Sequence, residues 1–231
     1  MAKSKTFVIS LGGSVMYPQD LDEKYLKDFH DFILRFVKRG YRFIIIVGGG
    51  KICRVYQEAA LKIGKATDTE RDWIGIKVIE LNALLLKTIL REKAYLTALA
   101  DKNKVSASKK FPVTILRCGE PGHSSDFAAV QAAVDFKAHT VVNLGKPHYV
   151  YTANPDKDPA AKPLKDLAWR EYFKIIPTKW TPGMSTPFDP IASRLAQKHG
   201  ISVIVADGRN LDNFKKILEG KAFKGTMIKN A

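Results

Sequence analysis

The sequence predicts an α/β fold in which a mostly parallel β-sheet is covered by helices on both faces. Strand-like runs alternate with helical patterns along most of the 231 residues. These runs are apolar at nearly every position, as in parallel strands that are buried on both sides. Two of them break at a run of glycines just before a helical pattern, at Gly12–Gly13 and at Gly48–Gly50. Ligands of open parallel sheets gather beyond the carboxyl ends of the strands, so these turns mark the expected binding edge.

The first strand is predicted at residues 6–11, where an apolar run ends at Gly-Gly-Ser, and an acidic helical stretch follows at 21–39. A second strand at 41–47 is rich in β-branched residues and leads through glycines into a helix at 53–63. The stretch 73–92 predicts a long helix because its apolar residues recur three and four positions apart. The first part of the chain therefore contains two strand–turn–helix units in succession.

The second part of the chain continues the alternation with shorter elements. Proline recurs too often between 147 and 190 for long regular elements, so this stretch is expected to be an irregular insert or a lid. No internal repeat or low-complexity linker interrupts the sequence. In chain order, the expected elements are strands at 93–98 and 113–117, a helix at 127–136, a strand at 140–144 and a helix–strand–helix unit across 191–218.

The composition is that of an ordinary soluble globular protein, with 45% apolar and 26% charged residues. No stretch approaches the roughly 20 uninterrupted apolar residues that span a bilayer. The amino-terminal "MAKSKTFVIS" lacks the long apolar region and cleavage site of a signal peptide. Cys53 and Cys118 lack the spacing of metal ligands and are expected to be free thiols in a reducing environment. We therefore expect a cytoplasmic protein without a membrane partner.

The formal net charge of +15 is the one unusual property of the composition. It is compatible with a nucleic-acid-binding protein or with an enzyme that acts on anionic substrates. Lys and Arg are scattered, however, and often alternate with Asp and Glu, as in "DLDEKYLKDFHDF". No zinc-finger, RNA-binding-sheet or helix-turn-helix signature accompanies them. A solvated basic surface is therefore favoured, and we expect no nucleic-acid partner.

Both glycine turns are candidate anion sites. The backbone N–H groups of residues 12–14 and 48–50 precede expected helices and could point toward phosphate oxygens. Glycine at these positions lets a ligand approach the backbone closely. Neither turn matches the dinucleotide fingerprint or the P-loop pattern, so each alone is weak support. Two such cradles in one sheet suit a phosphoryl transfer, with one phosphate bound at either end.

Longer motifs carry a resemblance that covers nearly the whole chain. They are "SLGGSV" (10–15), "VGGGK" (47–51), "RDWIGI" (71–76), "LNALLL" (81–86), "EPGHSSDFAA" (120–129), "YTANPDKDPAAKPL" (151–164), "PFDPIAS" (187–193) and "KGTMI" (224–228). Through these motifs the sequence resembles the amino acid kinase superfamily and, within it, the UMP kinases of the archaeal type. The Pro-Gly-His-Ser-Ser-Asp and Tyr-Thr-Ala-Asn-Pro-Asp-Lys-Asp-Pro stretches are the most specific part of this resemblance.

The resemblance implies one amino acid kinase domain over residues 1–231, folded as a three-layer α/β/α sandwich with a mostly parallel central sheet. Residues 1–140 would form most of the acceptor-nucleotide part, and residues 141–231 the ATP-side part. The implied reaction converts ATP and UMP to ADP and UDP with Mg²⁺. A homo-oligomer is also implied, and hexamers are common among the relatives.

The resemblance further implies roles for individual residues. Gly48 and Gly49 would bind the UMP phosphate, Asp72 its ribose, and Gly75, Ser124 and Ser125 would complete the UMP site. Gly12, Gly13, Ser14, Gly50, Lys146, Tyr151, Pro155 and Asp189 would bind ATP. Asp126, Lys51 and Gly13 would be the catalytic residues, with the Asp126 carboxylate ordering the reacting groups. Mg²⁺ would be held through the nucleotide phosphates, and no side chain is assigned to it.

The chain departs from the family pattern near the phosphates. Many relatives carry a lysine two residues before the first Gly-Gly, where this chain has Ser10. The positive charge at the reacting phosphates would then come from Lys51, from Lys146, or from the main chain with Mg²⁺. The usual Asn-Val-Asp-Gly before Val-Tyr is replaced by Lys-Pro-His-Tyr at 146–149, and Asn154 replaces the usual Asp.

Several residues also have simpler explanations. Asp72 and Asp126 each stand near an expected helix start and could cap that helix. His123 could assist phosphate binding or be an ordinary surface residue. Trp169 and Trp180 are expected to be packing residues. The group that reads uracil is not identified, although backbone groups at 119–123 are one option.

Other functions remain open at this point. The chain could phosphorylate a different small acceptor, as sister kinases of the same fold do. It could also be a nucleotide-binding sensor without catalysis, an alternative motivated by Ser10 and by the replacement at 146–149. The basic charge alone motivates a third class, a nucleic-acid-binding module.

Overall fold

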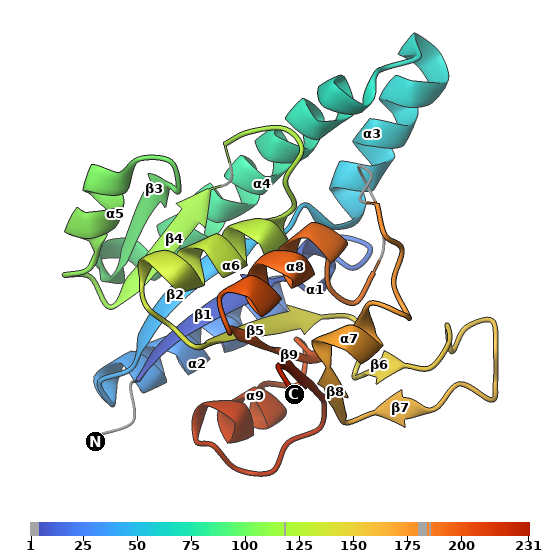
Figure 1. Cartoon of the computed structure of the whole chain (residues 1–231). Coiled ribbons are helices and arrows are strands. Elements are labelled where there is room, and N and C mark those ends of the chain that lie inside the picture. Colours follow the sequence, from blue (N-terminus) through green and yellow to red (C-terminus); the bar gives the residue numbers. More distant parts are fainter. Residues whose placement is uncertain (1–4, 118, 180–183, 185) are drawn as a thin grey trace.

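The fold is built on one large, mostly parallel sheet with helices on both faces (Figure 1). The computed structural model describes residues 5–117, 119–179, 184 and 186–231. Within these residues, eight strands form the sheet in the order β3-β4-β2-β1-β5-β9-β10-β8. Neighbouring strands run parallel except for β10, which is antiparallel to β9. This three-layer arrangement confirms the predicted fold class.

The strand bounds follow the apolar runs of the sequence closely. The predicted strands at 6–11 and 113–117 are confirmed without change, and the others differ by one residue at an end. The sheet strands are β1 (Thr6–Leu11), β2 (Arg42–Val47), β3 (Ala94–Ala98), β4 (Val113–Arg117), β5 (Thr140–Gly145), β8 (Asp166–Ala168), β9 (Ser202–Asp207) and β10 (Thr226–Lys229), and a separate hairpin pairs β6 (Val150–Tyr151) with β7 (Pro163–Leu164).

The helices cover both faces of the sheet. They are α1 (Gly13–Met16), α2 (Glu23–Lys38), α3 (Gly50–Gly64), α4 (Asp68–Leu90), α5 (Lys102–Ser108), α6 (Ser125–Asp135), α7 (Trp169–Tyr172), α8 (Pro190–Lys198) and α9 (Leu211–Leu218), with a 3₁₀ turn at Arg91–Lys93. The outer ends of α3 and α4 project together from the body of the molecule (Figure 1). Within the described part of the chain, no helix is long and apolar enough to cross a membrane.

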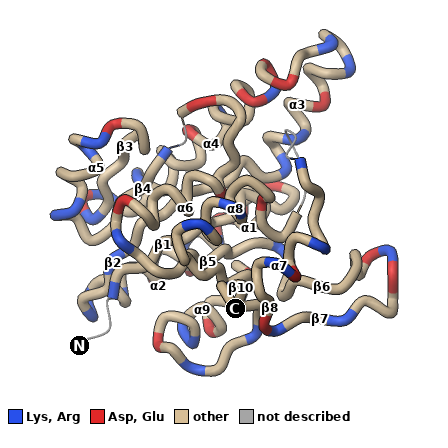
Figure 2. Tube along the Cα trace, viewed as in Figure 1, with Lys and Arg blue, Asp and Glu red and all other residues tan. Residues whose placement is uncertain are grey.

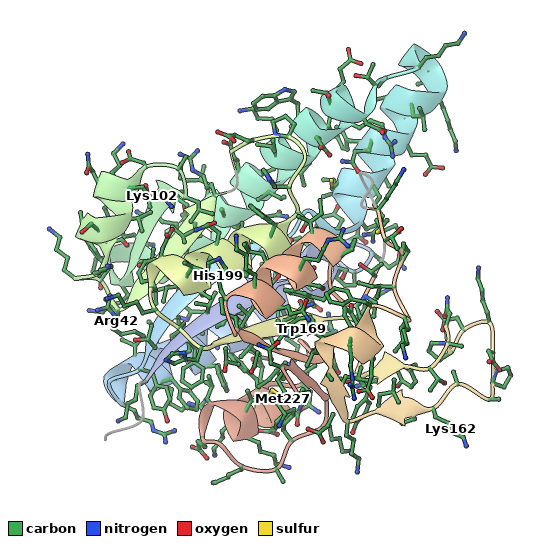
Figure 3. The ribbon with its side chains drawn as sticks, in the orientation of Figure 1. Arg42, Lys102, Lys162, Trp169, His199 and Met227 are labelled. Carbon is green, nitrogen blue, oxygen red and sulfur yellow. The ribbon has the colours of Figure 1, made fainter. Side chains whose placement is uncertain are left out.

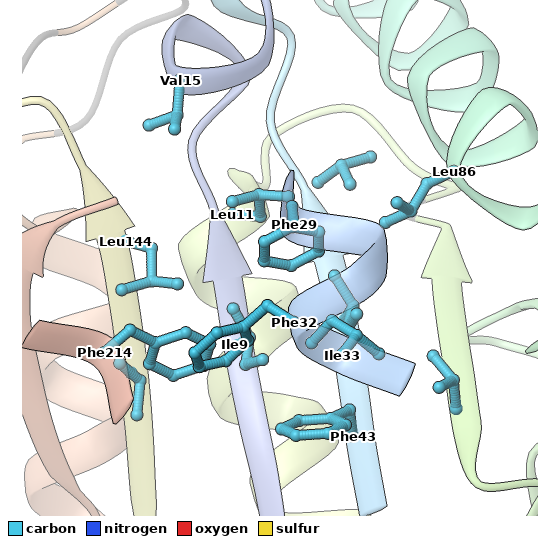
Figure 4. Close-up of a cluster of buried hydrophobic side chains, with 14 of the residues drawn as sticks. Ile9, Leu11, Val15, Phe29, Phe32, Ile33, Phe43, Leu86, Leu144 and Phe214 are labelled. Atoms are coloured by element: carbon cyan, nitrogen blue, oxygen red, sulfur yellow. The ribbon is translucent and has the colours of Figure 1, made fainter. Parts of the chain in front are cut away.

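Side chains from α2 and α9 fill the core on one face of the sheet. Phe29 and Phe32 of α2 are buried over the sheet, near Ile9 of β1 and Phe43 of β2 (Figure 4). Phe32 also stacks on Phe214 of α9, with ring centroids 5.1 Å apart. Burial of a large apolar side chain stabilises a fold by roughly 1.5–3 kcal/mol. This core therefore fixes the strands whose carboxyl ends carry the glycine turns.

The opposite face of the sheet is covered by α6 and α8. Val8 of β1 belongs to this second core, whereas its neighbour Ile9 belongs to the first, because successive side chains of a strand point to opposite faces. Ala129 and Ala133 of α6 are fully buried, which lets that helix lie close to the strands. Both faces of the sheet are therefore buried, and the strands are apolar throughout for this reason.

Capping side chains set two helix starts that hydrophobic spacing misplaced. Helix α4 begins at Asp68 and not at 73, because the Thr67 side chain accepts a hydrogen bond from Glu70 N and the Glu70 carboxylate accepts one from Thr67 N. Helix α6 begins at Ser125, two residues before the expected start, because the Ser124 hydroxyl accepts a hydrogen bond from Phe127 N. Because Thr67 and Ser124 are the caps, the nearby Asp72 and Asp126 do not cap these helices.

The structure also contains elements that the sequence did not predict. Helix α1, helix α5 and strand β10 are additions, and the proline-rich stretch 147–190 contains β6, β7, β8 and α7. Trp169 is 1% exposed and packs inside the fold, as expected (Figure 3). Trp180 and Cys118 lie outside the described residues. Lys and Arg occur along the whole chain and are interspersed with Asp and Glu (Figure 2).

Candidate active site

The two glycine turns lie side by side because β1 and β2 are adjacent parallel strands. Leu11, the last residue of β1, pairs with Val47, the last residue of β2. The N–H group of Gly48 donates a 2.8 Å hydrogen bond to the carbonyl oxygen of Leu11. On the other side of β1, Gly12 N donates a 2.8 Å hydrogen bond to Leu144 O of β5. The turns therefore continue the sheet and are held by its backbone.

Gly13 and Gly50 bring the two turns into direct backbone contact. A Cβ atom built on Gly50 would lie 2.6 Å from the carbonyl carbon of Gly13, and one built on Gly13 would overlap the backbone of Gly48 and Gly50. Gly50 also has a φ of +70°, a conformation that side chains disfavour. Helices α1 and α3 begin at these two glycines, so their first N–H groups have no partner within a helix.

A cavity of about 520 Å³ lies over the glycine turns. Its walls come from both turns, from α3 and α4, from the start of α6, and from Met184, Thr186 and Pro187. Twelve of the sixteen residues to which the resemblance assigns a site role line it: Gly12, Gly13, Ser14, Gly48, Gly49, Gly50, Asp72, Gly75, Ser124, Ser125, Asp126 and Lys146. Lys51, Tyr151, Pro155 and Asp189 are not part of its lining.

Asp126 is held from two sides at the floor of this cavity. Its Oδ1 accepts a 2.9 Å hydrogen bond from the Ser10 hydroxyl, and its Oδ2 accepts one of 3.2 Å from Asp189 N. Burial and the nearby Asp189 charge raise the pKa of Asp126 to about 7. Ser124 caps α6, so the interpretation of Asp126 as a cap is wrong. Asp189 itself caps α8 through its carboxylate, which accepts a hydrogen bond from Ala192 N.

Asp72 connects α4 to the loop before α6. It lies within the second turn of α4, whose cap is Thr67, so its interpretation as a cap is also wrong. Its Oδ2 accepts a 2.8 Å hydrogen bond from Gly122 N. Burial raises the pKa of Asp72, and the hydrogen bond from Gly122 opposes that rise. In the same loop, His123 lines the cavity and stacks on Phe127, with ring centroids 4.1 Å apart.

Two cations reach the cavity, and sequence reasoning missed one of them. Arg54 and Lys146 both line it, and within the described residues neither forms an ion pair. Arg54 follows the second glycine turn by one turn of α3, a spacing that could have identified it. The Lys51 amine instead forms a hydrogen bond with Gln19 Oε1.

The acidic residues of the cavity suit a metal ion that is bound mainly by phosphates. Across the part of the chain that the structure describes, no group of three or more His, Cys, Asp or Glu side chains could hold a metal ion. Asp72, Glu120, Asp126 and Asp156 line the cavity as separate carboxylates. Mg²⁺ commonly keeps several waters and binds substrate phosphates with only one or two carboxylates. The residues present therefore fit Mg²⁺ that arrives with a nucleotide.

The free thiol and a buried amide complete the wall between α3 and α4. Cys53 lines the cavity, and burial raises the pKa of its thiol. Gln57 donates a 2.8 Å hydrogen bond to Arg71 O and so ties the two helices together. A Cβ built on Gly75 would lie 3.0 Å from Gln57 Nε2, so glycine allows this close approach of the helices.

Comparison with known families and proteins agrees with this geometry. The model of the amino acid kinase family matches residues 5–207. The chain is 31% identical to a uridylate kinase of Methanocorpusculum labreanum over 226 residues, covering 97% of this chain and 95% of that protein. It is 32% identical to a uridylate kinase of Pyrococcus abyssi over 225 residues, covering 96% of this chain and 98% of the relative.

Solved structures show the same arrangement of elements. The crystal structure of uridylate kinase from Archaeoglobus fulgidus superposes with a TM-score of 0.79 and 28% identity, covering 96% of this chain and 99% of that one. The structure of UMP kinase from Bacillus anthracis gives a TM-score of 0.82 at 19% identity, covering 98% and 96%. The second similarity concerns the fold alone.

Proposed function

Because the chain belongs to the amino acid kinase family, we propose that it transfers the γ-phosphoryl group of ATP to UMP, giving ADP and UDP. One observation carries the proposal on the structural side. Two glycine turns meet backbone to backbone under a single cavity, and a helix begins at each of them. Such helix starts bind phosphate groups well. Two of them in contact place a donor phosphate and an acceptor phosphate next to each other.

The proposed reaction needs little covalent chemistry from the protein. An oxygen of the UMP phosphate forms a bond to the γ-phosphorus, and the bond from the γ-phosphorus to the β–γ bridging oxygen breaks. Positioning and charge neutralisation supply most of the catalysis in such transfers. We assign Gly48, Gly49, Asp72, Gly75, Ser124 and Ser125 to the UMP side, and Gly12, Gly13, Ser14, Gly50 and Lys146 to the ATP side.

We add Arg54 to the UMP side as a cation for the acceptor phosphate. It lines the cavity next to the second glycine turn, Gly48–Gly50, and has no ion-pair partner within the described residues. An Arg guanidinium binds phosphate oxygens through paired hydrogen bonds. Lys51 is left without a phosphate contact in this assignment, because its amine is held by Gln19.

The remaining residues of the site receive the following roles in this proposal. Asp126 orders the reacting groups, and Ser10 and Asp189 hold its carboxyl. Tyr151 and Pro155 belong to the β6–β7 hairpin, whose loop brings Asp156 to the cavity, so they would approach the ATP base. Residues 1–140 then supply most of the acceptor site, and residues 141–231 supply most of the walls for ATP. Mg²⁺ would enter with ATP and neutralise the charge on its phosphates.

A homo-oligomer is part of the proposal. Among the described residues, seven of the eight large apolar side chains that are exposed lie on α3 and α4: Val55, Tyr56, Leu61, Ile63, Trp73, Leu81 and Leu84. These side chains lie on two helices that pack against each other, and exposed apolar residues that gather in one region favour an interaction site. We propose that a second copy of the chain covers this surface. Hexamer size, a cytoplasmic location and the absence of a nucleic-acid partner stay predictions from the sequence.

The alternative acceptors and the sensor without catalysis are less well supported. Relatives that cover 95% or more of both chains share the name uridylate kinase. The sensor alternative rests partly on Ser10, which supplies no positive charge to the phosphates. Arg54 and Lys146 supply two cations at the cavity, so catalysis does not depend on a lysine at position 10 in this proposal. Nothing in the site favours a carboxylate or carbamate acceptor over a nucleotide.

The test is a coupled ADP-release assay with purified protein, Mg²⁺-ATP and a panel of UMP, CMP, dUMP, AMP and GMP. Turnover with UMP far above that with the other nucleotides is the expected result. UMP binding without turnover would show that the protein is a nucleotide-binding sensor and not a kinase. Turnover with isopentenyl phosphate, acetylglutamate or carbamate, and none with UMP, would establish a sister kinase.

A further inference from the structure

Tyr172 makes an unusual pair of hydrogen bonds behind the active site. Its hydroxyl donates a 2.8 Å hydrogen bond to Phe188 O and accepts one of 2.7 Å from Phe188 N. Both side chains are fully buried. Burial raises the pKa of Tyr172 well above its ordinary value, so the hydroxyl keeps its proton at every physiological pH. One side chain therefore fixes both backbone polar groups of one residue.

Phe188 is the middle residue of a segment that reaches the reacting groups. The residue before it, Pro187, lines the cavity, and its carbonyl oxygen accepts a 2.7 Å hydrogen bond from Asn143 Nδ2 of β5. The residue after it, Asp189, donates its N–H group to Asp126 Oδ2 at 3.2 Å. Three consecutive residues are thus held by three different elements, and the middle contact comes from α7.

The simpler explanation is that Tyr172 is only a packing residue whose hydroxyl needs a partner. Tyr25 is an example of that kind in the same chain: it is 5% exposed, and its hydroxyl donates one 2.9 Å hydrogen bond to Gly208 O. Tyr172 differs because its hydroxyl also accepts from a backbone N–H group. The Phe188 carbonyl that accepts from Tyr172 and the Asp189 N–H that donates to Asp126 belong to the same peptide unit, so the hydrogen bond from Tyr172 resists rotation of the unit that carries this donor.

We propose that Tyr172 is a positioning residue for the phosphoryl transfer, acting through the backbone of Phe188 and Asp189 to hold the carboxyl of Asp126. The inference rests on the proposed function, because Asp126 is assigned to the reacting groups there. Tyr172 is the last residue of α7, within the proline-rich stretch 147–190. The carboxyl is held by Ser10 on one side and, on the other, by a segment that Tyr172 keeps in place.

The first experiment compares Tyr172→Phe with Tyr25→Phe as a matched control. Each variant loses one buried hydroxyl and keeps its ring. Tyr172→Phe is expected to lower kcat at pH 7 about tenfold, with a change of less than threefold in KM for UMP. Tyr25→Phe is expected to stay within about twofold of the wild type in both constants.

The pH profile separates positioning from packing. The titratable groups that face Asp126 are Asp189, the cap of α8, which raises its pKa, and Tyr172 of α7, whose own pKa is raised in part by the charge of Asp126. The Ser10 hydroxyl and Asp189 N donate hydrogen bonds to Asp126. These two hydrogen bonds lower the pKa of Asp126, so loosening the one from Asp189 N raises it. The acidic limb of kcat in Tyr172→Phe should therefore move to higher pH, and activity should recover toward pH 9. A profile superimposable on the wild type, at any level of kcat, would overturn the proposal.

A second measurement does not depend on catalysis. Urea unfolding of both Tyr→Phe variants is compared at pH 5.5 and pH 8.5, with and without Asp126→Asn. Relative to the wild type, the folding equilibrium constant of Tyr172→Phe should fall several-fold more at pH 8.5 than at pH 5.5. The reason is that the hydrogen bond from Asp189 N stabilises the ionised carboxyl of Asp126, which predominates at the higher pH. Asp126→Asn should remove that difference, and Tyr25→Phe should show none.

The outcomes also separate this inference from the proposed function. If the wild type turns over no nucleotide, the proposed function fails, and the unfolding experiment still decides whether Tyr172 holds Asp126. If the wild type is active and Tyr172→Phe loses stability equally at both pH values, Tyr172 is a packing residue and the inference fails alone.

Discussion

Ser10 Oγ lies 2.9 Å from Asp126 Oδ1 and donates a hydrogen bond that joins β1 to the start of α6. This donor is a neutral hydroxyl and not a cation. Burial and the Asp189 charge are therefore not offset by a positive partner bonded to the carboxyl, and the pKa of Asp126 reaches about 7. The carboxyl titrates close to physiological pH for this reason.

The variant Ser10→Ala tests that hydrogen bond directly. Loss of the donor raises the pKa of Asp126, because the hydrogen bond from Ser10 lowers it. If the ionised carboxyl is needed for turnover, the acidic limb of the kcat profile moves to higher pH and activity at pH 7 falls several-fold. Ser108→Ala is the control, since it removes another buried serine hydroxyl, bonded to Val105 O at 2.7 Å, far from the cavity. An unmoved pH profile in Ser10→Ala would remove Ser10 from the mechanism.

The variant Asp126→Asn is expected to fold and to bind both nucleotides, because asparagine has nearly the same shape as aspartate. We expect kcat to fall by at least about a hundredfold, a loss typical of removing a positioned acid–base or charged group. Steady-state kinetics and calorimetric binding of UMP measure the two parts separately. Turnover at the wild-type rate would show that the carboxylate does not order the reacting groups.

The stability of the protein should depend on pH through Asp126. Its pKa is about 7 in the folded state and close to 3.8 in the unfolded chain, so the folded state binds more protons between these values. Stability contributed by this group is then greatest below about pH 4 and falls as the pH rises to about 7, by at most roughly 4 kcal/mol. The stability of Asp126→Asn should not decrease in this way as the pH rises. Urea unfolding from pH 5 to pH 8 checks it, and parallel curves for both proteins would contradict the pKa.

Replacement of Arg54 should affect UMP more than ATP. Arg54→Ala removes a cation from the cavity wall beside the second glycine turn. A charged hydrogen bond is worth about 1.5–3 kcal/mol, so KM for UMP is expected to rise roughly 10- to 100-fold. Lys51→Ala should change it less than threefold, because that amine is bonded to Gln19. An equal rise in KM for UMP in the two variants would show that Lys51 also binds the acceptor phosphate.

The glycine at position 13 should be irreplaceable. In Gly13→Ala, the new methyl group would overlap the backbone of Gly48 and Gly50, which cannot move away without disturbing β2. We expect turnover to be lost and the unfolding midpoint to fall. Gly64→Ala is the control, since a Cβ there meets no atom within 4 Å. Measurement of both variants by kinetics and thermal unfolding separates the loss of the cradle from a general effect of alanine.

The fold was predictable from the sequence because the strands are apolar on both faces. The runs at 6–11 and 113–117 coincide with β1 and β4, and the glycine turns fall where parallel strands end. The helix starts were harder, since single capping side chains such as Thr67 decide them independently of hydrophobic spacing. Helix α5 has seven residues and lacked a clear periodic signal.

The site was predictable where a motif fixes the backbone. It was less predictable where the conformation of a long side chain decides which group the side chain contacts. The glycines of both turns line the cavity as expected. Lys51 directly follows such a turn in sequence, yet its amine extends to Gln19, whereas Arg54 returns to the cavity from the next turn of the helix. Tyr172 acts on a segment sixteen residues away, and no pattern in the sequence indicates that contact.

The contact between Gly13 and Gly50 also limits how the enzyme can move. With no side chain between the two turns, the spacing of the donor and acceptor cradles is the thickness of two peptide backbones. A side chain at Gly13 or Gly50 would force the two turns apart. Any opening and closing during turnover would then involve parts away from this contact, such as the β6–β7 hairpin.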